Sequence, residues 1–191
     1  NDLRKFHQEF PTTARESFVT TGRSVFNIDV LSTLILNSQK LQRETPSEGF
    51  HIPVQAWKER DGSQKYIIEA MDDGELQVWQ RPQSGKEYRI GADISEGIDV
   101  GRDTDWSVGV VLDASNMDEV ATIRIKIDPD LFAWQLASLG KWYNNAKLIV
   151  ERNNHGLVTL KFLSDVHLYP DIYSEKILDE RSSRSARKLG F

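Results

Sequence analysis

The sequence predicts an α/β fold in which helices flank one mixed sheet, and two observations predict it. Strand-like runs at residues 88–94, 105–112 and 120–127 follow one another closely, and such short gaps favour antiparallel neighbours. From residue 128 onward helical and strand patterns alternate, so a strand reached through a helix is expected to run parallel to an earlier one. The length of 191 residues suffices for one sizeable core.

Composition excludes several classes of protein. The chain has no cysteine, which excludes a disulfide scaffold, thiolate zinc sites and cysteine nucleophiles. The formal net charge of −5 excludes a uniformly basic nucleic-acid coat but leaves room for a local basic face. No apolar run approaches the roughly 20 residues that span a bilayer, and no signal peptide is recognisable. Because there is no initiator Met, we expect a piece of a longer protein.

Two segments precede the predicted sheet core. Residues 1–45 are polar and helix-prone, and within them residues 27–40 place apolar side chains at the spacing of an amphipathic helix. The segment that follows is rich in turn pairs. In it the strand-like runs 65–69 and 76–79 are expected to pair as a hairpin across Asp73 and Gly74.

A helix is predicted directly after the third strand. Asp128 can serve as its N-cap, and Pro129 suits the first helical position. The apolar positions that line one face of this helix are Phe132, Leu136, Leu139 and Tyr143. Residues 147–151 then form a fourth strand, which is expected to lie parallel to an earlier one.

A second helix and a fifth strand complete the expected order. Asn153 or Asn154 can cap the helix. Its inward-facing positions are expected to be Leu157, Leu160 and Leu163. Residues 167–169 are expected as the fifth strand. Three antiparallel strands, a helix, a strand, a helix and a strand is the ribonuclease-H-like order.

Three acidic residues are expected at one edge of this sheet. Asp93 ends the first strand and Glu151 ends the fourth, and neighbouring parallel strands end at the same edge. Asp105 opens the second strand, which runs antiparallel to the first, so it is expected beside Asp93. Three carboxylates scattered along the sequence should therefore converge.

Clustered carboxylates need a counter-charge. Two carboxylates about 4 Å apart repel by roughly 4 kcal/mol at an effective dielectric of about 20. A divalent cation removes this repulsion, and oxygen ligands select Mg²⁺ or Mn²⁺. Two such ions can together stabilise the attacking water and the leaving oxygen in phosphodiester hydrolysis. Single acids at strand ends also serve as turn and cap residues, which is the alternative interpretation of each.

Two other phosphate- or cation-binding patterns are excluded. Counted from Asp93, the sixth position is Ile98, where an EF-hand loop requires Gly. The pair Gly85-Lys86 is followed by Glu87, at the position where a phosphate-binding loop requires Ser or Thr. Recognisable ATP-binding motifs are therefore absent from the sequence.

The segments around the three acidic residues, and one segment near the N-terminus, resemble those of a known family. Residues 91–97, Gly-Ala-Asp-Ile-Ser-Glu-Gly, and 103–108, Asp-Thr-Asp-Trp-Ser-Val, resemble the first nuclease motif of tailed-phage large terminase subunits. Residues 150–156, Val-Glu-Arg-Asn-Asn-His-Gly, resemble their second motif. Residues 6–26 are similar to the segment in which those proteins pass from ATPase to nuclease.

The resemblance implies a domain organisation and a set of ligands. Residues 1–45 would be the end of the ATPase–nuclease connector, and residues 46–191 a ribonuclease-H-like nuclease domain. Asp93 and Glu151 match two metal-binding acids of the family, while Asp105 matches an acid found in many members. The family's third metal-binding Asp follows a hairpin, so it is expected beyond residue 191. Mg²⁺ or Mn²⁺ would be the cofactor, with two ions in the complete site.

The resemblance also implies partners: double-stranded DNA, the phage portal and the small terminase subunit, in the host cell cytoplasm. The isolated domain is expected to be monomeric. Arg152 is expected either to contact a phosphate or to pair with a site carboxylate. A basic cluster close to the C-terminus is interpreted as a DNA-backbone contact or as a solvated tail, and its members are Arg181, Arg184, Arg187 and Lys188. Trp106, Trp134 and Trp142 are expected in the core, and His155 in a first helical turn without chemistry.

The sequence therefore predicts a metal-dependent DNA endonuclease domain of a phage DNA-packaging terminase, with Asp93, Glu151 and Asp105 as its catalytic and metal-binding residues. Two alternatives stay open. One is a resolvase- or integrase-type nuclease of the same fold. The other is a ribonuclease-H-like module that binds DNA or a portal protein without cutting.

Overall fold

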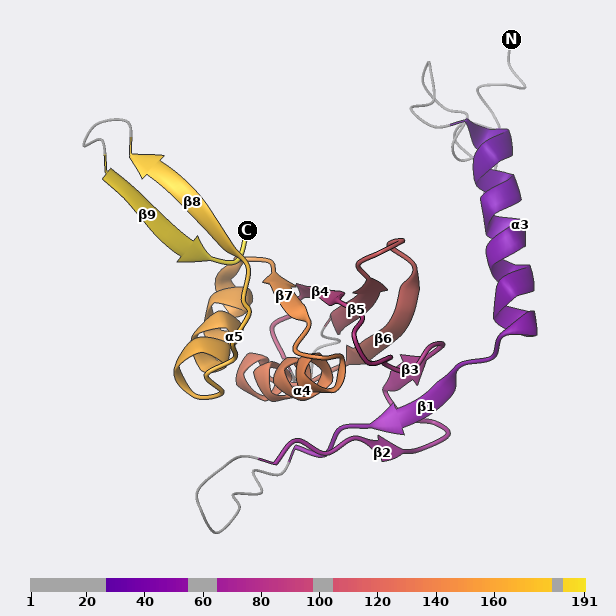
Figure 1. Cartoon of the computed structure of the whole chain (residues 1–191), viewed down its shortest axis with the longest axis horizontal. Helices are drawn as coiled ribbons and strands as arrows, with labels where there is room; N and C mark the ends of the chain where they lie inside the picture. Colours follow the sequence, from indigo (N-terminus) through magenta and orange to yellow (C-terminus); the bar gives the residue numbers. More distant parts are fainter. Residues whose placement is uncertain (1–26, 55–64, 98–104, 180–183) are drawn as a thin grey trace, which may run out of the picture. The chain divides into compact units, whose positions relative to one another are not determined.

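A computed structural model describes residues 27–54, 65–97, 105–179 and 184–191 (Figure 1). The chain divides into two units after Pro46. In the first unit the helix α3 (Ile28–Glu44) confirms the predicted helix and extends it. Asn27 begins it, because its side-chain oxygen accepts a hydrogen bond from the backbone N–H of Val30 at 3.2 Å. None of the helices in the described ranges is long and apolar enough to cross a bilayer.

The second unit is built on a seven-stranded mixed sheet with strand order β2-β1-β3-β6-β5-β4-β7. The strands are β1 (Glu48–His51), β2 (Glu69–Ala70), β3 (Leu76–Val78), β4 (Tyr88–Asp93), β5 (Ser107–Asp113), β6 (Glu119–Ile125) and β7 (Lys147–Val150). Each strand pairs antiparallel with its neighbours, except that β4 and β7 run parallel. The predicted fold class, three antiparallel strands followed by a parallel one, is confirmed.

The predicted hairpin of residues 65–69 with 76–79 is wrong. Strand β1 lies between β2 and β3 and pairs with both. The turn residue Gly74 lies directly against the β1 backbone, where a Cβ would collide with the carbonyl of Phe50. The Asp73-Gly74 turn therefore leaves room for an inserted strand, and does not close a two-residue hairpin.

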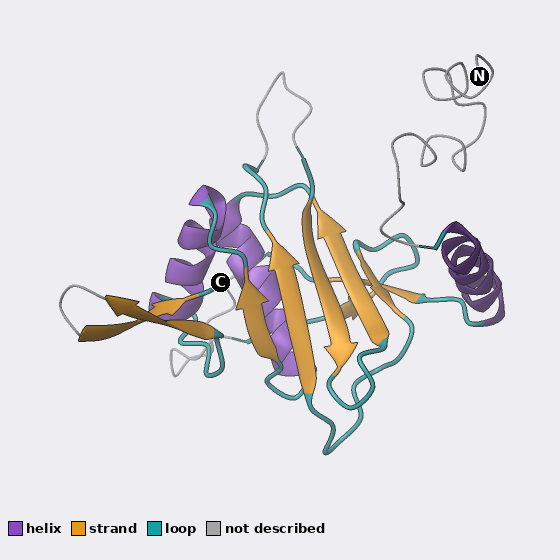
Figure 2. Cartoon of the chain, turned by 90° about the horizontal axis from the view of Figure 1, so that it is seen from above, coloured by secondary structure: helices purple, strands orange, loops and turns teal. Residues whose placement is uncertain are grey.

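Helices α4 (Pro129–Trp142) and α5 (Asn154–Asp165) cover one face of the sheet (Figure 2). Alternate residues of β4 are buried, and Gly109 of β5 leaves room for the Leu136 side chain of α4. Pro129 occupies the first turn as predicted, although the Asp128 side chain makes no capping hydrogen bond. All four predicted core positions are buried: Phe132, Leu136 and Leu139 of α4, and Tyr143, its C-cap.

Two expectations for the C-terminal part are wrong. In α5, Leu160 and Leu163 are buried, but Leu157 is 51% exposed. The inward-facing positions one turn before Leu160 and Leu163 are occupied by the small Gly156 and Thr159, so Leu157 lies off the buried face. Residues 167–169 form no strand, since Leu168 has a φ of 47° that extended backbone cannot adopt.

The chain continues past α5 along the free edge of β7. Leu148 forms an isolated parallel bridge with Ile172. Beyond it, β8 (Ser174–Asp179) and β9 (Arg184–Leu189) form a separate antiparallel two-stranded sheet. The chain then returns to the edge of β7, where the backbone N–H of Phe191 donates to the Val150 carbonyl.

The second face of the sheet, called here the open face, carries the residues of β4 that alternate with the buried ones. Arg89, Gly91 and Asp93 of β4 are all exposed on it. A Cβ placed on Gly91 would find no described atom within 4 Å. In the described part of the chain this face therefore has free space above β4.

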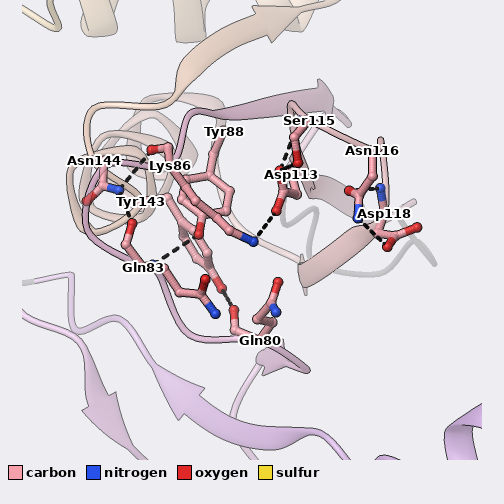
Figure 3. A network of polar contacts seen from close by, with 10 residues as sticks. All are labelled: Gln80, Gln83, Lys86, Tyr88, Asp113, Ser115, Asn116, Asp118, Tyr143 and Asn144. Carbon is pink, nitrogen blue, oxygen red and sulfur yellow. Dashed lines mark hydrogen bonds and ion pairs between the residues drawn. The ribbon is translucent and has the colours of Figure 1, made fainter.

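A polar network closes the end of the sheet where β4 begins and β5 ends (Figure 3). Lys86 Nζ lies 2.7 Å from the buried carboxylate of Asp113. The Ser115 hydroxyl and backbone N–H donate to the other carboxylate oxygen, at 2.6 and 2.9 Å. The hydrogen bond from Lys86, followed by those from Ser115, lowers the pKa of Asp113 to about 2.

This network predicts how stability depends on pH. Since the pKa of Asp113 falls from 3.8 to about 2 on folding, its ionised form stabilises the fold above pH 3.8, and that contribution is lost as the pH falls towards 2. Asp113→Asn should therefore unfold at lower urea than the wild type at pH 7, and the gap should narrow below about pH 4. Urea titrations across pH would measure it, with the exposed Asp118→Asn as matched control. A gap that stays constant down to pH 2 would contradict the assignment.

Candidate active site

The parallel pairing of β4 with β7 brings two acids together. Ala92 pairs with Val150, and the backbone N–H of Glu151 donates to the carbonyl of Ala92 at 3.1 Å. Asp93 and Glu151 are the next residues along each strand, so they lie side by side at a strand separation of about 4.8 Å. Strand alternation turns both away from the buried Ala92 and Val150. Asp93 and Glu151, called here the acid pair, thus share the open face.

Asp105 and Asp93 both line a cleft of about 490 Å³. Ser95 holds the two segments together, because its hydroxyl donates to the Asp105 carbonyl at 2.9 Å and its N–H donates to the Ser107 hydroxyl at 3.1 Å. The cleft is lined by Asp93, Ile94, Ser95, Glu96, Asp105, Trp106, Asn153 and His155. His155, which was expected to have no chemistry, therefore lies within reach of anything bound there.

Glu151 lines a second hollow of about 370 Å³, which it shares with Asp93. Apolar side chains form much of this hollow, among them Val108, Val110 and Ile149. Phe191 also lines it. Its N–H donates to the Val150 carbonyl at 3.3 Å, and its carbonyl accepts from the Arg152 N–H at 3.0 Å. Asp93 thus belongs to both hollows, whereas Asp105 and Glu151 each line one.

The acid pair suits a hard divalent cation. Carboxylate oxygens are the ligands that Mg²⁺ prefers, and two carboxylates with water molecules suffice for one ion. Among the described residues, however, no group of three His, Cys, Asp or Glu side chains is placed to hold a metal ion. Asp93 and Glu151 would hold the ion, and Asp105 stands on the neighbouring wall of the cleft.

Asn153 and Gly156, which follow Glu151, allow helix α5 to begin next to the end of β4. Asn153 is the N-cap of α5: its side-chain oxygen accepts from the Gly156 N–H at 2.7 Å. Its amide nitrogen donates to the Ile94 carbonyl at 3.3 Å and so links α5 to the end of β4. A Cβ on Gly156 would collide with the Glu151 carbonyl, so glycine allows the helix to start directly against the acid.

Arg152 and Lys188, two of the predicted DNA-binding residues, lie on the β7 side of the acid pair. The Arg152 side chain is 24% exposed, and its guanidinium lies 3.9 Å from Glu175, so it faces a carboxylate outside the candidate site. Arg152 shares a hollow of about 320 Å³ with Lys188. Arg187 and Lys188 are exposed on β9, which also begins with Arg184, so these residues belong to a strand. Arg181 lies outside the described residues.

The prediction that Trp106 lies in the core is wrong. Trp106 is 43% exposed, because it precedes the buried Ser107 and therefore faces the opposite side of β5. The Arg124 guanidinium lies 4.3 Å from its ring centroid, and Lys126 Nζ lies 5.1 Å from it. The period-2 alternation of β6 was visible in the sequence and could have placed these two cations on one face. Trp134, by contrast, is buried as predicted.

No family model matches this sequence, and no curated protein matches it. Solved structures of the large terminase nuclease from thermophilic phage G20c do match. In fold, the chain is similar to that nuclease. The form with bound cobalt aligns at 20% identity and TM-score 0.44, over 52% of this chain and 50% of its own. The form with bound magnesium aligns at 19% identity and TM-score 0.43, over the same shares. This chain thus spans about half the length of both structures.

A further structure of the same nuclease aligns at 15% identity and TM-score 0.36, over 62% of this chain and 81% of its own.

The Asn153 bridge predicts a measurable loss of stability. Asn153→Ala removes the cap of α5 and its link to Ile94, and should lower the free energy of unfolding by about 1 kcal/mol. Asn153→Ser keeps a capping oxygen and should recover much of that loss. Chemical denaturation followed by circular dichroism would measure both. Equal stability of all three proteins would show that the cap contributes nothing.

Proposed function

We propose that this chain contains the metal-dependent DNA endonuclease domain of a phage DNA-packaging terminase, which cuts concatemeric viral DNA by two-metal phosphodiester hydrolysis. The observation that carries the proposal is the acid pair, Asp93 and Glu151, at the ends of adjacent parallel strands on the open face. Its support from the sequence is the resemblance of residues 91–97 and 150–156 to the two nuclease motifs.

The proposed roles follow from the positions of the side chains. Asp93 and Glu151 bind the cation, and Asp105 assists from the adjoining wall. Bound Mg²⁺ or Mn²⁺ would supply an activated water and charge stabilisation for the leaving oxygen. Asp93 lines both hollows, so a phosphate on either side of it stays within reach. The third acid of the family pattern is proposed to follow Phe191, whose backbone is hydrogen-bonded beside Glu151.

DNA would be held by local charge, because the net charge of the chain is −5. Arg152 and Lys188 line one hollow beside α5, and Arg187 is exposed on the same strand as Lys188. With Arg181 and Arg184, they form the proposed backbone contact. Such contacts neutralise phosphates without reading bases, so cutting should depend only weakly on sequence.

The remaining proposals concern the setting of the domain. Residues 1–45 are proposed as the end of the connector from an ATPase domain. The phage portal and the small terminase subunit are the proposed protein partners, in the cytoplasm of the host cell. The isolated domain is proposed to be a monomer.

Removing either acid should abolish cutting without unfolding the protein. Asp93→Asn and Glu151→Gln keep the side-chain shape and remove a cation ligand. Since losing even a supporting group around a metal costs about 10- to 100-fold, losing a ligand should cost at least about 100-fold. The measurement is nicking of supercoiled plasmid with Mg²⁺ or Mn²⁺.

Asp118→Asn is the matched control for the acid pair. Asp118 is an exposed acid in the turn before β6, at the end of the sheet opposite to Asp93, and it lines neither hollow that Asp93 lines. Its variant should nick at the wild-type rate. Wild-type nicking by Asp93→Asn or Glu151→Gln would refute the proposed function.

The basic residues of β9 predict a change in salt dependence. Replacing Arg187 and Lys188 together by Gln removes two phosphate contacts, so the slope of log affinity against log salt should flatten by about 1.8. Fluorescence anisotropy with labelled duplex DNA, without divalent metal, would measure the slope. An unchanged slope would mean that these side chains are solvated and do not contact DNA.

A further inference from the structure

A row of directly paired residues crosses the sheet at the level of the acid pair. Asp93 of β4 pairs with Val108 of β5, and Val108 pairs with Arg124 of β6. Residues paired directly across strands lie on the same face of a sheet. Arg124 is therefore on the open face with Asp93, two strand spacings or about 10 Å away.

Trp106 and Lys126 lie on the same face, two residues further along β5 and β6 than the pair Val108 and Arg124. Ser107 pairs with Ile125, so Trp106 and Lys126 stand opposite each other one position further along their strands. The Trp106 ring, 43% exposed, has the Arg124 guanidinium at 4.3 Å and Lys126 Nζ at 5.1 Å from its centroid. We call Trp106, Arg124 and Lys126 the β5–β6 cluster.

The ring contact orients the guanidinium without consuming its donors. A cation over an aromatic face is attracted by the ring quadrupole, and this contact uses none of the N–H groups. Arg124 is exposed and forms no ion pair within the described ranges of the chain. Among the described residues, no carboxylate therefore occupies its planar set of donors, whose geometry suits a bidentate anion such as a phosphodiester.

The surrounding surface also suits a nucleic-acid strand. Trp106 lines the same cleft as Asp93 and Asp105, so a strand that reaches the acids passes the ring. Exposed aromatic rings beside cations hold nucleic-acid strands by stacking, with little dependence on sequence. The distance of about 10 Å between the Asp93 and Arg124 positions is short enough for one DNA strand to contact both.

We infer that the β5–β6 cluster binds the DNA backbone next to the acid pair, with Arg124 and Lys126 on phosphates and Trp106 against a sugar or base. The inference rests on the proposed function, since it takes DNA as the substrate. It adds a second contact region, because Arg152 and Lys188 lie on the β7 side of the acids and Arg124 lies on the β6 side. The phosphate bound to Arg124 thus lies close along the strand to the bond at Asp93.

The test is binding of labelled DNA, single-stranded and duplex, to the whole chain in EDTA, where no cutting can occur. Arg124→Gln should weaken binding several-fold and flatten the salt slope by about 0.9, because one phosphate contact is lost. Trp106→Ala should weaken binding by about tenfold, and Trp106→Phe should restore much of it.

Lys141→Gln is the matched control. Lys141 lies 5.0 Å from the Tyr66 ring centroid, so this variant also removes one charge over an aromatic ring, but on α4, which covers the other face of the sheet. It should bind DNA like the wild type. Circular dichroism of each variant checks that the fold is kept.

The outcomes separate this inference from the proposed function. If Arg124→Gln and Trp106→Ala bind with wild-type affinity and salt slope, the inference is overturned, whatever the nicking assay shows. If the wild type does not bind DNA in EDTA, the inference is also overturned. Loss of nicking in Asp93→Asn with unchanged binding would support the proposed function and leave the cluster to be judged by its own variants.

Discussion

The parallel pairing of β4 with β7 is the constraint on which the candidate site depends. Antiparallel neighbours place the end of one strand beside the start of the next, so residues from two strand ends meet only when the strands run the same way. Helix α4 provides the crossover that makes this possible, and its buried side chains hold β4 and β7 in place. The four paired positions from Arg89 to Ala92 then fix where Asp93 meets Glu151.

Charge is distributed unequally between the two ends of the sheet. At the end where β4 begins, Asp113 is compensated by Lys86 and Ser115, so a buried carboxylate there stabilises the fold. At the other end, Asp93 and Glu151 stand together on the open face. A pair of like charges is tolerated at that end because it is accessible to water and to a cation. If the acid pair binds a cation as proposed, the repulsion between the two carboxylates is relieved only when that cation is bound.

Much of the sheet could be predicted because its pattern is local. The alternation in β4, β5 and β6 shows each strand, and chain order with the helical crossover indicates which strands are parallel. The position of β1 could not be predicted, because its four residues carry a weak pattern and its pairing with β2 and β3 is set by long-range contacts. Sequence also placed Trp106 in the core, since alternation shows that a strand has two faces but not which face is covered.

The placement of Asp93 beside Glu151 could be reasoned from strand ends, but the neighbourhood of Arg124 could not. That neighbourhood depends on the register of β5 with β6, which contains an irregularity between Val111 and Leu112. One inserted residue shifts every later cross-strand pair and reverses which face a side chain occupies. Cross-strand contacts beyond such an irregularity can be assigned only from the three-dimensional structure.

The free space above Gly91 allows a spectroscopic label to be attached to the open face. The chain has no cysteine, so a cysteine introduced at Gly91 would be its sole thiol. The two neighbours of Gly91 on the open face are Arg89 and Asp93, and no described atom lies within 4 Å of the new Cβ. A fluorophore or spin label attached there would sit beside the acid pair without displacing core atoms. The glycine thereby offers a single attachment point from which occupancy of this face can be observed by spectroscopy.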